Sequence, residues 1–312
     1  MTLLIKESEV DQIFTLKDAY ESLREAFIYE ENKRAINTKR IRTSFSGSTL
    51  TYQAGALEGY IGFKTYVRGN FVSLLFSSDG ELLMIAESDR LSLFRTGALS
   101  VLAADVMRKS YSSVGIIGLG KQGIAQVEAF HNLVPGAKVL GYTRSPEREG
   151  KARKTLSKLG IPLQTLPSIK DVVSKVDVIV TITTATSPFL KREYVGESVH
   201  INAMGSNLPE RVELFPEIIK ASALIAVEDK DQAREEAGDL ILAEKMGMLD
   251  WKKTVNISEI LAGKVTTPSG ITIFKSVGIG LEDVAVMKTL FNKAKSRGLG
   301  REIEVNGRWS PE

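Results

Sequence analysis

The chain has 312 residues, 43% of them hydrophobic and 25% charged, which is ordinary for a globular protein of one large or two medium domains. A formal net charge of +3, with basic residues interleaved among acids, excludes a strongly basic surface and predicts no nucleic-acid partner. The chain has no cysteine, only two histidines and no apolar run that could span a bilayer. We therefore expect a cytoplasmic protein with no metal site and no membrane partner.

The first third of the chain predicts a mixed α+β region. Thr15 and Asp18 have the spacing of a helix N-cap and its partner, and the apolar residues after them recur at helical spacing, which predicts a helix over 15–32. Short β-rich runs separated by turn residues follow at Thr49–Gln53, Tyr60–Val67, Phe71–Ser77 and Glu81–Glu87. A helix rich in small residues is predicted over Asp89–Arg108.

From residue 114 onward, predicted strands alternate with predicted helices, which indicates a mainly parallel sheet with helices on both faces. The strands after the first are expected at Lys138–Thr143, Pro162–Leu166, Asp177–Thr184, Ser198–Met204, Ala223–Val227 and Ile271–Phe274. The helices are expected over 122–132, 146–159, 168–175 and Leu281–Lys295. The predicted fold class is α/β: a Rossmann doubly wound dinucleotide-binding domain plus an α+β domain.

A glycine motif lies where the alternating region begins. A β-favouring run starting at Val114 leads into Gly118, Gly120 and Gly123, which are spaced G-x-G-x-x-G. The first glycine permits a tight strand-to-helix turn, the second admits a pyrophosphate, and the third allows close helix–strand packing. Small residues also occur in ordinary tight turns, so the spacing alone leaves both interpretations open. The predicted phosphate-binding residues are Gly118, Leu119, Gly120, Lys121, Gln122 and Gly123, at a helix N-terminus that favours an anion.

The loop after the second strand of this domain bears on the choice of cofactor. NAD-binding folds usually place an acid there to bind the ribose hydroxyls. Here the loop contains Thr143, Arg144 and Ser145, and no acid precedes Glu147. An arginine flanked by hydroxyls suits a 2′-phosphate, although an ordinary polar loop would look the same. Together with the glycine motif, the loop favours NADP(H) and leaves NAD(H) possible.

Lys64 lies in a β-patterned run, on the face opposite Phe63 and Thr65. If that face is buried, desolvation will lower its pKa and let it act as an acid or base near neutral pH; a solvated strand lysine is the alternative. His200 also lies in a strand pattern, and we expect it to be a hydrogen-bonded core residue.

Arg95 shares an apolar helical face with Leu91 and Leu99. A guanidinium in such surroundings needs an anionic partner, and its fork of donors suits a carboxylate. That partner could be a substrate carboxylate or an acid of the chain itself. Asp283, beside Glu282 in the last predicted helix, is one candidate for this partner, and an exposed surface acid is the alternative interpretation.

Five separated segments resemble the ornithine cyclodeaminase/mu-crystallin family, and they occur in the family's order over nearly the whole chain. They are Gly62–Lys64, Phe94–Val101, the glycine motif, His200–Glu210 with Glu213-Leu214, and Lys275–Asp283. The resemblance implies a homodimer and a nicotinamide-dependent reaction at a small amino or imino acid. It also implies a substrate-binding and dimerisation domain over 1–110, completed by a C-terminal helix over 285–312, and a Rossmann NAD(P)-binding domain over 111–284.

The resemblance also assigns roles to particular residues. Lys64 matches the family's catalytic lysine and substrate ligand, Arg95 its substrate-carboxylate arginine, and Arg40 the second such arginine, although Arg42 is close enough to compete. The matching cofactor contacts are Thr183 and Thr184, together with Ser276, Val277 and Gly278 near the nicotinamide.

Two departures from the family's pattern bear on the reaction. Asn207 stands where cyclodeaminases have an aspartate, and an amide can hydrogen-bond a nitrogen or a bound water but cannot act as a base. Thr51 stands where they have an acid for the distal amine of ornithine. The expected activity is therefore an NAD(P)H-dependent oxidoreductase of the alanine dehydrogenase or pyrroline/piperideine-2-carboxylate reductase type, with Asn207 in its catalytic site. The alternatives are an ornithine cyclodeaminase, which converts ornithine to proline and ammonia, and a non-catalytic NADP(H)-binding protein like mu-crystallin.

Overall fold

The computed structural model describes residues 1–205, 207–305 and 307, and the chain forms two compact units. One unit contains Met1–Arg95 together with the chain from Ile279 onward. The other contains Thr96–Gly278. Within the described residues, no helix is both long enough and apolar enough to cross a membrane.

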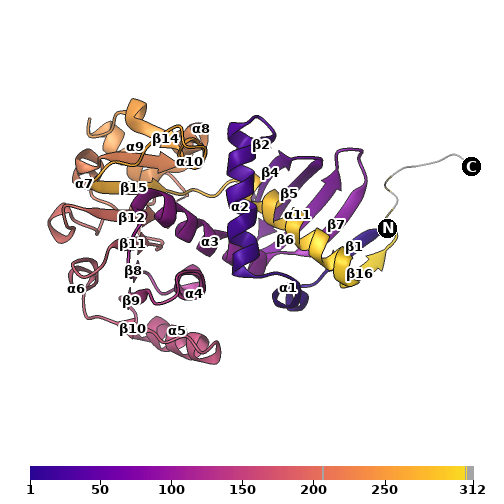
Figure 1. The fold of residues 1–312 in the computed structure, drawn as a ribbon, viewed down its shortest axis with the longest axis horizontal. Coiled ribbons are helices and arrows are strands. Elements are labelled where there is room, and N and C mark those ends of the chain that lie inside the picture. Colours follow the sequence, from indigo (N-terminus) through magenta and orange to yellow (C-terminus); the bar gives the residue numbers. More distant parts are fainter. Residues whose placement is uncertain (206, 306, 308–312) are drawn as a thin grey trace, which may run out of the picture. The chain divides into compact units, whose positions relative to one another are not determined.

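The discontinuous unit is built on an eight-stranded, mainly antiparallel sheet (Figure 1). Its strands are β1 (Thr2–Ile5), β2 (Ala35–Asn37), β3 (Ile41–Phe45), β4 (Ser48–Leu57), β5 (Tyr60–Val67), β6 (Asn70–Ser77), β7 (Leu82–Glu87) and β16 (Arg301–Ile303). They are ordered β16-β1-β7-β6-β5-β4-β2, with β3 also paired to β4, and only β1 and β7 pair in parallel. The four predicted strands are all present, whereas the three short ones, β1, β2 and β16, and strand β3 were not predicted.

The helices of this unit are α1 (Glu7–Ile13), α2 (Leu16–Glu31) and α11 (Gly280–Arg297). Helix α11 packs on β4 and β5 and beside α2 (Figure 1). The predicted N-cap of α2 is confirmed, because the Thr15 hydroxyl accepts from the backbone N–H of Asp18 at 3.2 Å and the Asp18 carboxylate accepts from that of Thr15 at 2.9 Å.

The two faces of this sheet differ. The face that carries Gln53 and Lys64 is buried, and these two residues lie directly opposite each other on β4 and β5. The strand register places six exposed apolar side chains on the other face, where Ile36 is 64% and Ile61 50% exposed. The six are Ile36, Ile41, Phe45, Leu50, Ile61 and Val72.

The prediction of a C-terminal helix over 285–312 is wrong at its end. Helix α11 stops at Arg297 because Gly298 adopts a left-handed conformation with φ +64°, which ends a helix. The chain then forms β16, which pairs antiparallel with β1. Residues 306 and 308–312 of the predicted range lie outside the described residues.

The second unit is built on an eight-stranded sheet in which every pairing is parallel, with helices on both faces (Figure 1). Its strands are β8 (Ser113–Ile117), β9 (Lys138–Tyr142), β10 (Gln164–Thr165), β11 (Val178–Thr181), β12 (Val199–Ala203), β13 (Leu224–Val227), β14 (Thr254–Asn256) and β15 (Ile271–Lys275). They are ordered β10-β9-β8-β11-β12-β15-β13-β14. Parallel strands with crossover helices confirm the predicted Rossmann doubly wound fold.

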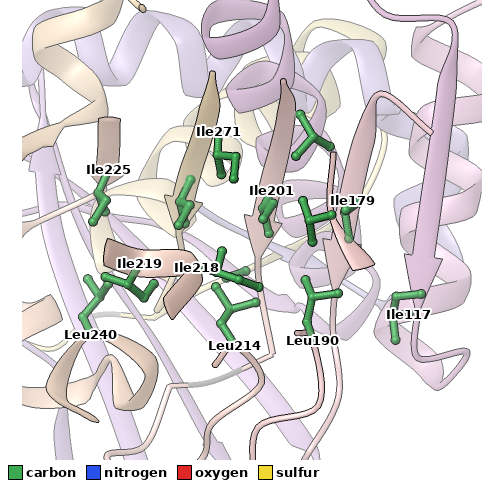
Figure 2. Packing of buried hydrophobic residues seen from close by; sticks show 14 of the residues in the cluster. Ile117, Ile179, Leu190, Ile201, Leu214, Ile218, Ile219, Ile225, Leu240 and Ile271 are labelled. Carbon is green, nitrogen blue, oxygen red and sulfur yellow. The ribbon is translucent and has the colours of Figure 1, made fainter. Parts of the chain in front are cut away.

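The helices of this unit are α3 (Asp89–Arg108, which begins in the first unit), α4 (Lys121–Leu133), α5 (Pro146–Lys158), α6 (Ile169–Val173), α7 (Pro216–Ala221), α8 (Lys230–Glu236), α9 (Gly238–Lys245), α10 (Ile257–Leu261) and the 3₁₀ turns Arg192–Tyr194 and Trp251–Lys253. Figure 2 shows side chains of α7 and α9, among them Ile218 and Leu240, packed with strand residues such as Ile201 and Ile225. This apolar layer covers one face of the parallel sheet and stabilises it.

The boundaries of the two units fall earlier in the chain than predicted. The first lies at 95/96 instead of 110/111, because the C-terminal part of α3 packs within the parallel-sheet unit, where Gly97 is in close contact with Ala125 and Ala129 of α4. The second lies at 278/279 instead of 284/285, because the first residues of α11 pack against β4. The assignment of substrate binding to one unit and cofactor binding to the other stays a prediction.

Candidate active site

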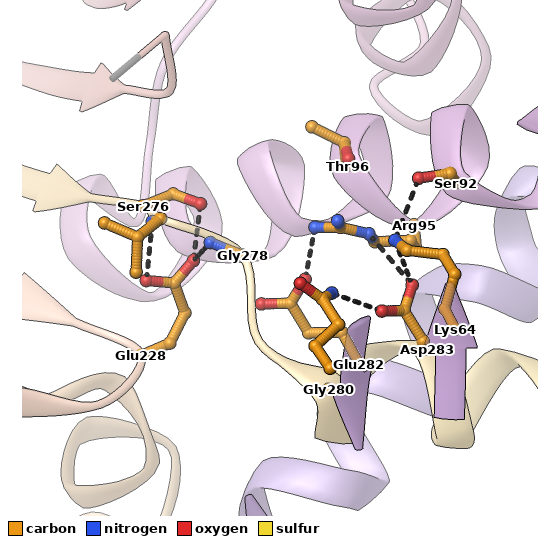
Figure 3. Close-up of polar contacts among 12 residues, drawn as sticks. Lys64, Ser92, Arg95, Thr96, Glu228, Ser276, Gly278, Gly280, Glu282 and Asp283 are labelled. Atoms are coloured by element: carbon orange, nitrogen blue, oxygen red, sulfur yellow. Dashed lines mark hydrogen bonds and ion pairs between the residues drawn. The ribbon is translucent and has the colours of Figure 1, made fainter. Parts of the chain in front are cut away.

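Lys64 is the centre of a buried cluster of charges in the first unit. Its side chain is 3% exposed, and its Nζ lies 2.7 Å from Oδ1 of Asp283 and 3.2 Å from Oγ of Ser92, to both of which it donates (Figure 3). Strand alternation turns Lys64 toward this face, and Asp283 lies in the first turn of α11. The alternative of a solvated strand lysine is therefore excluded.

Arg95 belongs to the same cluster. Its Nη1 lies 2.5 Å from Oε2 of Glu282, and its Nε lies 3.5 Å from Oδ1 of Asp283 (Figure 3). The side chain of Arg95 is 9% exposed and that of Glu282 is fully buried. The anionic partner that its apolar position requires is thus supplied by acids of α11. Because a guanidinium carries five N–H donors, these contacts are compatible with a further carboxylate.

Arg40 joins the cluster through an amide. Its Nε donates to Oε1 of Gln53 at 2.8 Å, and Nε2 of Gln53 donates to Oδ2 of Asp283. A continuous chain of hydrogen bonds thus runs from Arg40 to Lys64. Arg42, the competing arginine, lies on β3 opposite Thr51.

The protonation of Lys64 and Asp283 follows from their surroundings. Burial is the main cause that lowers the pKa of Lys64 to about 8, and the positive charge of Arg95 lowers it further. The negative charge of Asp283 acts in the opposite direction and raises it. Burial raises the pKa of the Asp283 carboxyl, but the charges of Lys64 and Arg95 outweigh it and hold that pKa below its usual value. The predicted lowering of the Lys64 pKa is confirmed, and the pair is ionised at neutral pH.

Three members of this cluster were absent from the predicted site. Asp283 was considered only as a partner of Arg95, and Glu282 and Gln53 were not considered. The signal for the two acids is their place in the first turn of a helix after the Lys275–Asp283 segment. The signal for Gln53 is the register of β4 on β5, which places it directly across from Lys64.

The glycine motif has the predicted geometry. Gly118 has φ +113°, and a side chain at Gly123 would place its Cβ 1.8 Å from the Gly118 carbonyl oxygen. At Gly120, by contrast, no described atom beyond the two adjoining residues lies within 4 Å of an added Cβ. Helix α4 starts at Lys121, and no side chain caps it, so its first N–H groups and the open space at Gly120 fit a pyrophosphate.

The other predicted cofactor residues, and the predicted catalytic residue Asn207, all follow the carboxyl ends of parallel strands, which meet at one edge of the sheet. Thr143, Arg144 and Ser145 follow β9, Thr183 and Thr184 follow β11, Asn207 follows β12, and Ser276, Val277 and Gly278 follow β15. Arg144 is exposed, and the Ser145 hydroxyl caps α5 by accepting from the backbone N–H of Arg148 at 3.2 Å. The fold therefore brings these nine residues to one edge, while the cofactor contacts of eight of them and the catalytic role of Asn207 stay predictions.

A buried carboxylate joins two of these loops. Glu213 accepts from the backbone N–H of Thr183 at 2.6 Å and from that of Gly205 at 3.1 Å, and also from the Thr181 hydroxyl at 2.7 Å. Burial raises the pKa of Glu213. Sequence reasoning noted Glu213 only as part of a resembling segment.

His200 is a core residue, as predicted. It is fully buried, and its ring nitrogens lie 2.9 Å from the Thr272 hydroxyl and 2.9 Å from Oδ1 of Asn202. Burial lowers its pKa to about 4, so the ring is neutral at physiological pH.

Comparison with known proteins identifies the class to which this fold and site belong. The profile of the ornithine cyclodeaminase/mu-crystallin family matches residues 6–298. The chain belongs to this family.

Several relatives are dehydrogenases or reductases by name, and solved structures of some of them hold NAD or NADH. The chain is 30% identical to alanine dehydrogenase of Archaeoglobus fulgidus, over 97% of this chain and 98% of the relative. The structure of an archaeal alanine dehydrogenase dimer with bound NAD superimposes with a TM-score of 0.88 at 29% identity, covering 97% of this chain and 99% of that one. Delta(1)-pyrroline-2-carboxylate reductase of Thermococcus litoralis, in complex with NADH and L-proline, superimposes with a TM-score of 0.87 at 27% identity, covering 97% and 100%.

Proposed function

We propose that the protein is an NAD(P)H-dependent oxidoreductase that acts on the C–N bond of a small α-amino or α-imino acid. The observation that carries this proposal is the buried cluster of Lys64, Arg95 and Asp283, in a chain that also has a glycine turn with space for a pyrophosphate. The named activities of the alanine dehydrogenase and pyrroline-2-carboxylate reductase relatives support it.

The charges of the cluster favour a substrate with one carboxylate. Lys64, Arg95 and Arg40 contribute three positive charges, and Asp283 and Glu282 two negative ones, which leaves one positive charge among these five side chains. An α-imino acid brings one carboxylate, which would neutralise that charge. We assign its binding to Arg95 and Arg40, which would orient the carbon of the C=N bond.

Lys64 is the proton donor of the proposed reduction. A bound nicotinamide cofactor would supply the hydride for the imine carbon, and the imine nitrogen would take a proton from Lys64, so that C=N would become HC–NH. With a pKa of about 8, the Lys64 ammonium is populated at neutral pH yet acidic enough to give up its proton. In the oxidative direction the neutral amine takes the proton back. Asn207 would hydrogen-bond the nitrogen or a bound water.

The same residues argue against ornithine cyclodeaminase. The amide of Asn207 cannot act as a base, and Thr51, whose side chain is buried, offers no acid for a second amine. Retention of both Lys64 and Arg95 in one buried cluster likewise disfavours a protein that only stores the cofactor.

For the cofactor, we propose a preference for NADP(H) over NAD(H). It rests on Arg144, which is exposed after β9 between two hydroxyl residues, and on the absence of an acid before Glu147 in that loop. The relatives with solved complexes hold NAD or NADH, so the two cofactors must be compared directly.

We further propose that the chain forms a homodimer through the exposed apolar face of the antiparallel sheet. This face carries Ile36, Ile41, Ile61 and Val72, and a contiguous exposed apolar surface marks an association site. The occupant we propose is the same face of a second copy, because the archaeal alanine dehydrogenase is a dimer. Sedimentation of the native chain should give twice the chain mass, and Ile61→Lys should give the monomer.

An absorbance screen at 340 nm tests the proposed function. NADH and NADPH are each combined with pyruvate plus ammonia, pyrroline-2-carboxylate and piperideine-2-carboxylate, and ornithine is assayed separately for ammonia. Oxidation of the nucleotide by at least one of these substrates, lost in Lys64→Ala with cofactor affinity retained, is expected. Ammonia and proline from ornithine without net oxidation would establish the cyclodeaminase instead, and tight NADPH binding without any turnover would establish a binding protein.

A further inference from the structure

Glu228 is a fully buried acid directly after β13 in the parallel-sheet unit. One of its oxygens, Oε1, accepts from the Ser276 hydroxyl and from the backbone N–H of Gly278 at 3.1 Å. The other, Oε2, accepts from the backbone N–H of Val277 at 3.2 Å (Figure 3). A single carboxylate thus binds three consecutive residues of the loop after β15.

A second side chain holds the same loop from the following helix. Nε2 of Gln232, in α8, donates to the carbonyl oxygen of Gly278 at 3.2 Å and to Oε2 of Glu236 at 2.9 Å. Gly278 has φ +73°, a left-handed conformation that glycine adopts readily. Both backbone polar groups of Gly278 are therefore bound to side chains of the β13–α8 segment, and the turn has one defined shape.

The segment held in this way is short and carries two kinds of residue. Ser276, Val277 and Gly278 match the family's residues near the nicotinamide, and Glu282 and Asp283, which pair with Arg95 and Lys64, follow within five residues of Gly278. Burying a carboxylate is costly unless it is fully hydrogen-bonded, and an apolar side chain would fill the same core position without that cost. We therefore infer that a carboxylate is present at this buried position because it binds the loop after β15.

We propose that Glu228 is a positioning residue that holds Ser276–Gly278 in the backbone conformation that contacts the nicotinamide end of the cofactor. This inference rests on the proposed function, because it takes the cofactor to be a nicotinamide dinucleotide. Glu228 does not touch the cofactor or the substrate in this proposal, and its effect passes through the loop.

The substitution Glu228→Gln separates this role from simple packing. Glutamine has nearly the same shape, but one oxygen becomes an NH₂ donor. Both carboxylate oxygens of Glu228 accept from a backbone N–H. In the glutamine variant the side-chain NH₂ must therefore face the backbone N–H of either Val277 or Gly278, and two donors cannot form a hydrogen bond. The Ser276 hydroxyl can rotate to accept a hydrogen bond, but a backbone N–H cannot. The loop therefore loses at least one of its bonds and its defined shape.

The test compares two ligands that differ only at the nicotinamide. Isothermal titration calorimetry measures the binding of NADPH and of 2′-phospho-ADP-ribose, or of NADH and ADP-ribose if the native protein prefers NADH. In Glu228→Gln we expect the dinucleotide to bind about tenfold more weakly, as for the loss of one charge-assisted hydrogen bond, and the ADP-ribose ligand to bind as in the native protein. With any substrate found in the screen, kcat should fall while the KM of that substrate changes little.

Asp229→Asn is the matched control. It removes a carboxylate from the neighbouring residue, and asparagine can cap α8 as Asp229 does by accepting from the N–H groups of Asp231 and Gln232. Both affinities should stay at the native values. Glu228→Asp, which keeps the charge but shortens the reach, should show the same selective loss to a smaller degree and serves if the glutamine variant does not fold.

An equal loss of both ligands, or no loss of either, in the folded variant would overturn the proposal. Failure of the proposed function looks different, because then the native protein itself would bind no nicotinamide dinucleotide, or would bind one and reduce none of the imino acids. The calorimetric comparison does not depend on turnover.

Discussion

Replacing Asp283 by asparagine should move the pKa of Lys64 and with it the pH dependence of the reaction. Nζ of Lys64 and Oδ1 of Asp283 lie 2.7 Å apart, and at an effective dielectric constant of about 20 two unit charges at that distance attract by roughly 6 kcal/mol. Asparagine keeps an acceptor for the ammonium, so only part of this is lost. Loss of only a third of this attraction, roughly 2 kcal/mol, would lower the pKa of Lys64 from about 8 to about 6.5.

The direction in which the pH limits of the reaction move depends on the protonation state of Lys64 that reduction and oxidation each require. The carboxylate of Asp283 stabilises the ammonium, so its removal favours the neutral amine. Reduction requires the ammonium, and its alkaline limit should move from about pH 8 to about pH 6.5. Oxidation requires the neutral amine, and its acid limit should move the same way. At pH 7.5 the variant should therefore lose about eightfold in the rate of reduction, because the ammonium fraction falls, and gain up to about fourfold in the rate of oxidation, because the neutral fraction rises.

The assay is kcat/KM against pH, measured in both directions between pH 5.5 and 9.5. Glu282→Gln is the control, because it makes the same charge change in the same turn of α11 but at a residue that contacts Arg95 instead of Lys64. Its pH limits should stay near 8. If Asp283→Asn keeps a limit near pH 8 in both directions, Lys64 is not the titrating group and the assigned proton transfer is refuted.

Three further predictions concern the parallel-sheet unit. Gly123→Ala should lose more than about 3 kcal/mol of folding free energy in urea denaturation, since its Cβ would lie 1.8 Å from the Gly118 carbonyl oxygen. Gly120→Ala should keep the native melting temperature and lose cofactor affinity, because the space at Gly120 is open. Equal behaviour of the two variants would contradict the assigned roles. Burial lowers the pKa of His200 from 6.5 to about 4, so its contribution to the free energy of unfolding is full above pH 6.5 and falls by about 2 to 3 kcal/mol as the pH drops toward 4. Urea titrations at pH 7 and pH 4.5 should therefore show a smaller fall in stability for His200→Gln than for the native protein. An equal fall in the two proteins would refute the assignment. Arg144→Asp should weaken NADPH binding at least about tenfold and spare NADH, and undiminished NADPH affinity would remove this loop from the cofactor preference.

Local patterns in the sequence predicted the elements that local physics determines. The Thr15–Asp18 cap and the small residues of Asp89–Arg108 each led to a helix with nearly the observed ends. The short elements β1, β2 and β16 were missed, because three or four residues are too few to show a period and their pairing is long-range.

The candidate site was predicted in part for the same reason. Lys64 and Arg95 stand out locally, because each is a charge in an apolar pattern. Their partner Asp283 is 219 residues from Lys64 in the sequence, and only the docking of α11 on the sheet brings the two together. Likewise Gln53 is an ordinary strand residue until the register of β4 on β5 sets it across from Lys64. Side chains with a role in holding others, such as Glu228, carry no signal of their own.

The discontinuity of the first unit has a consequence for synthesis on the ribosome. The parallel-sheet unit is one continuous stretch, Thr96–Gly278, whereas the first unit needs α11, which emerges only after all of that stretch. Lys64 and Arg95 are therefore translated at least 187 residues before their acidic partners, so the buried charges cannot be neutralised until α11 has emerged. We expect stalled nascent chains ending near residue 278 to protect the parallel-sheet unit from protease and leave Met1–Arg95 sensitive; early protection of both would contradict this order. The charged cluster around Lys64 is thus completed by α11, a helix that is translated only after the whole parallel-sheet unit.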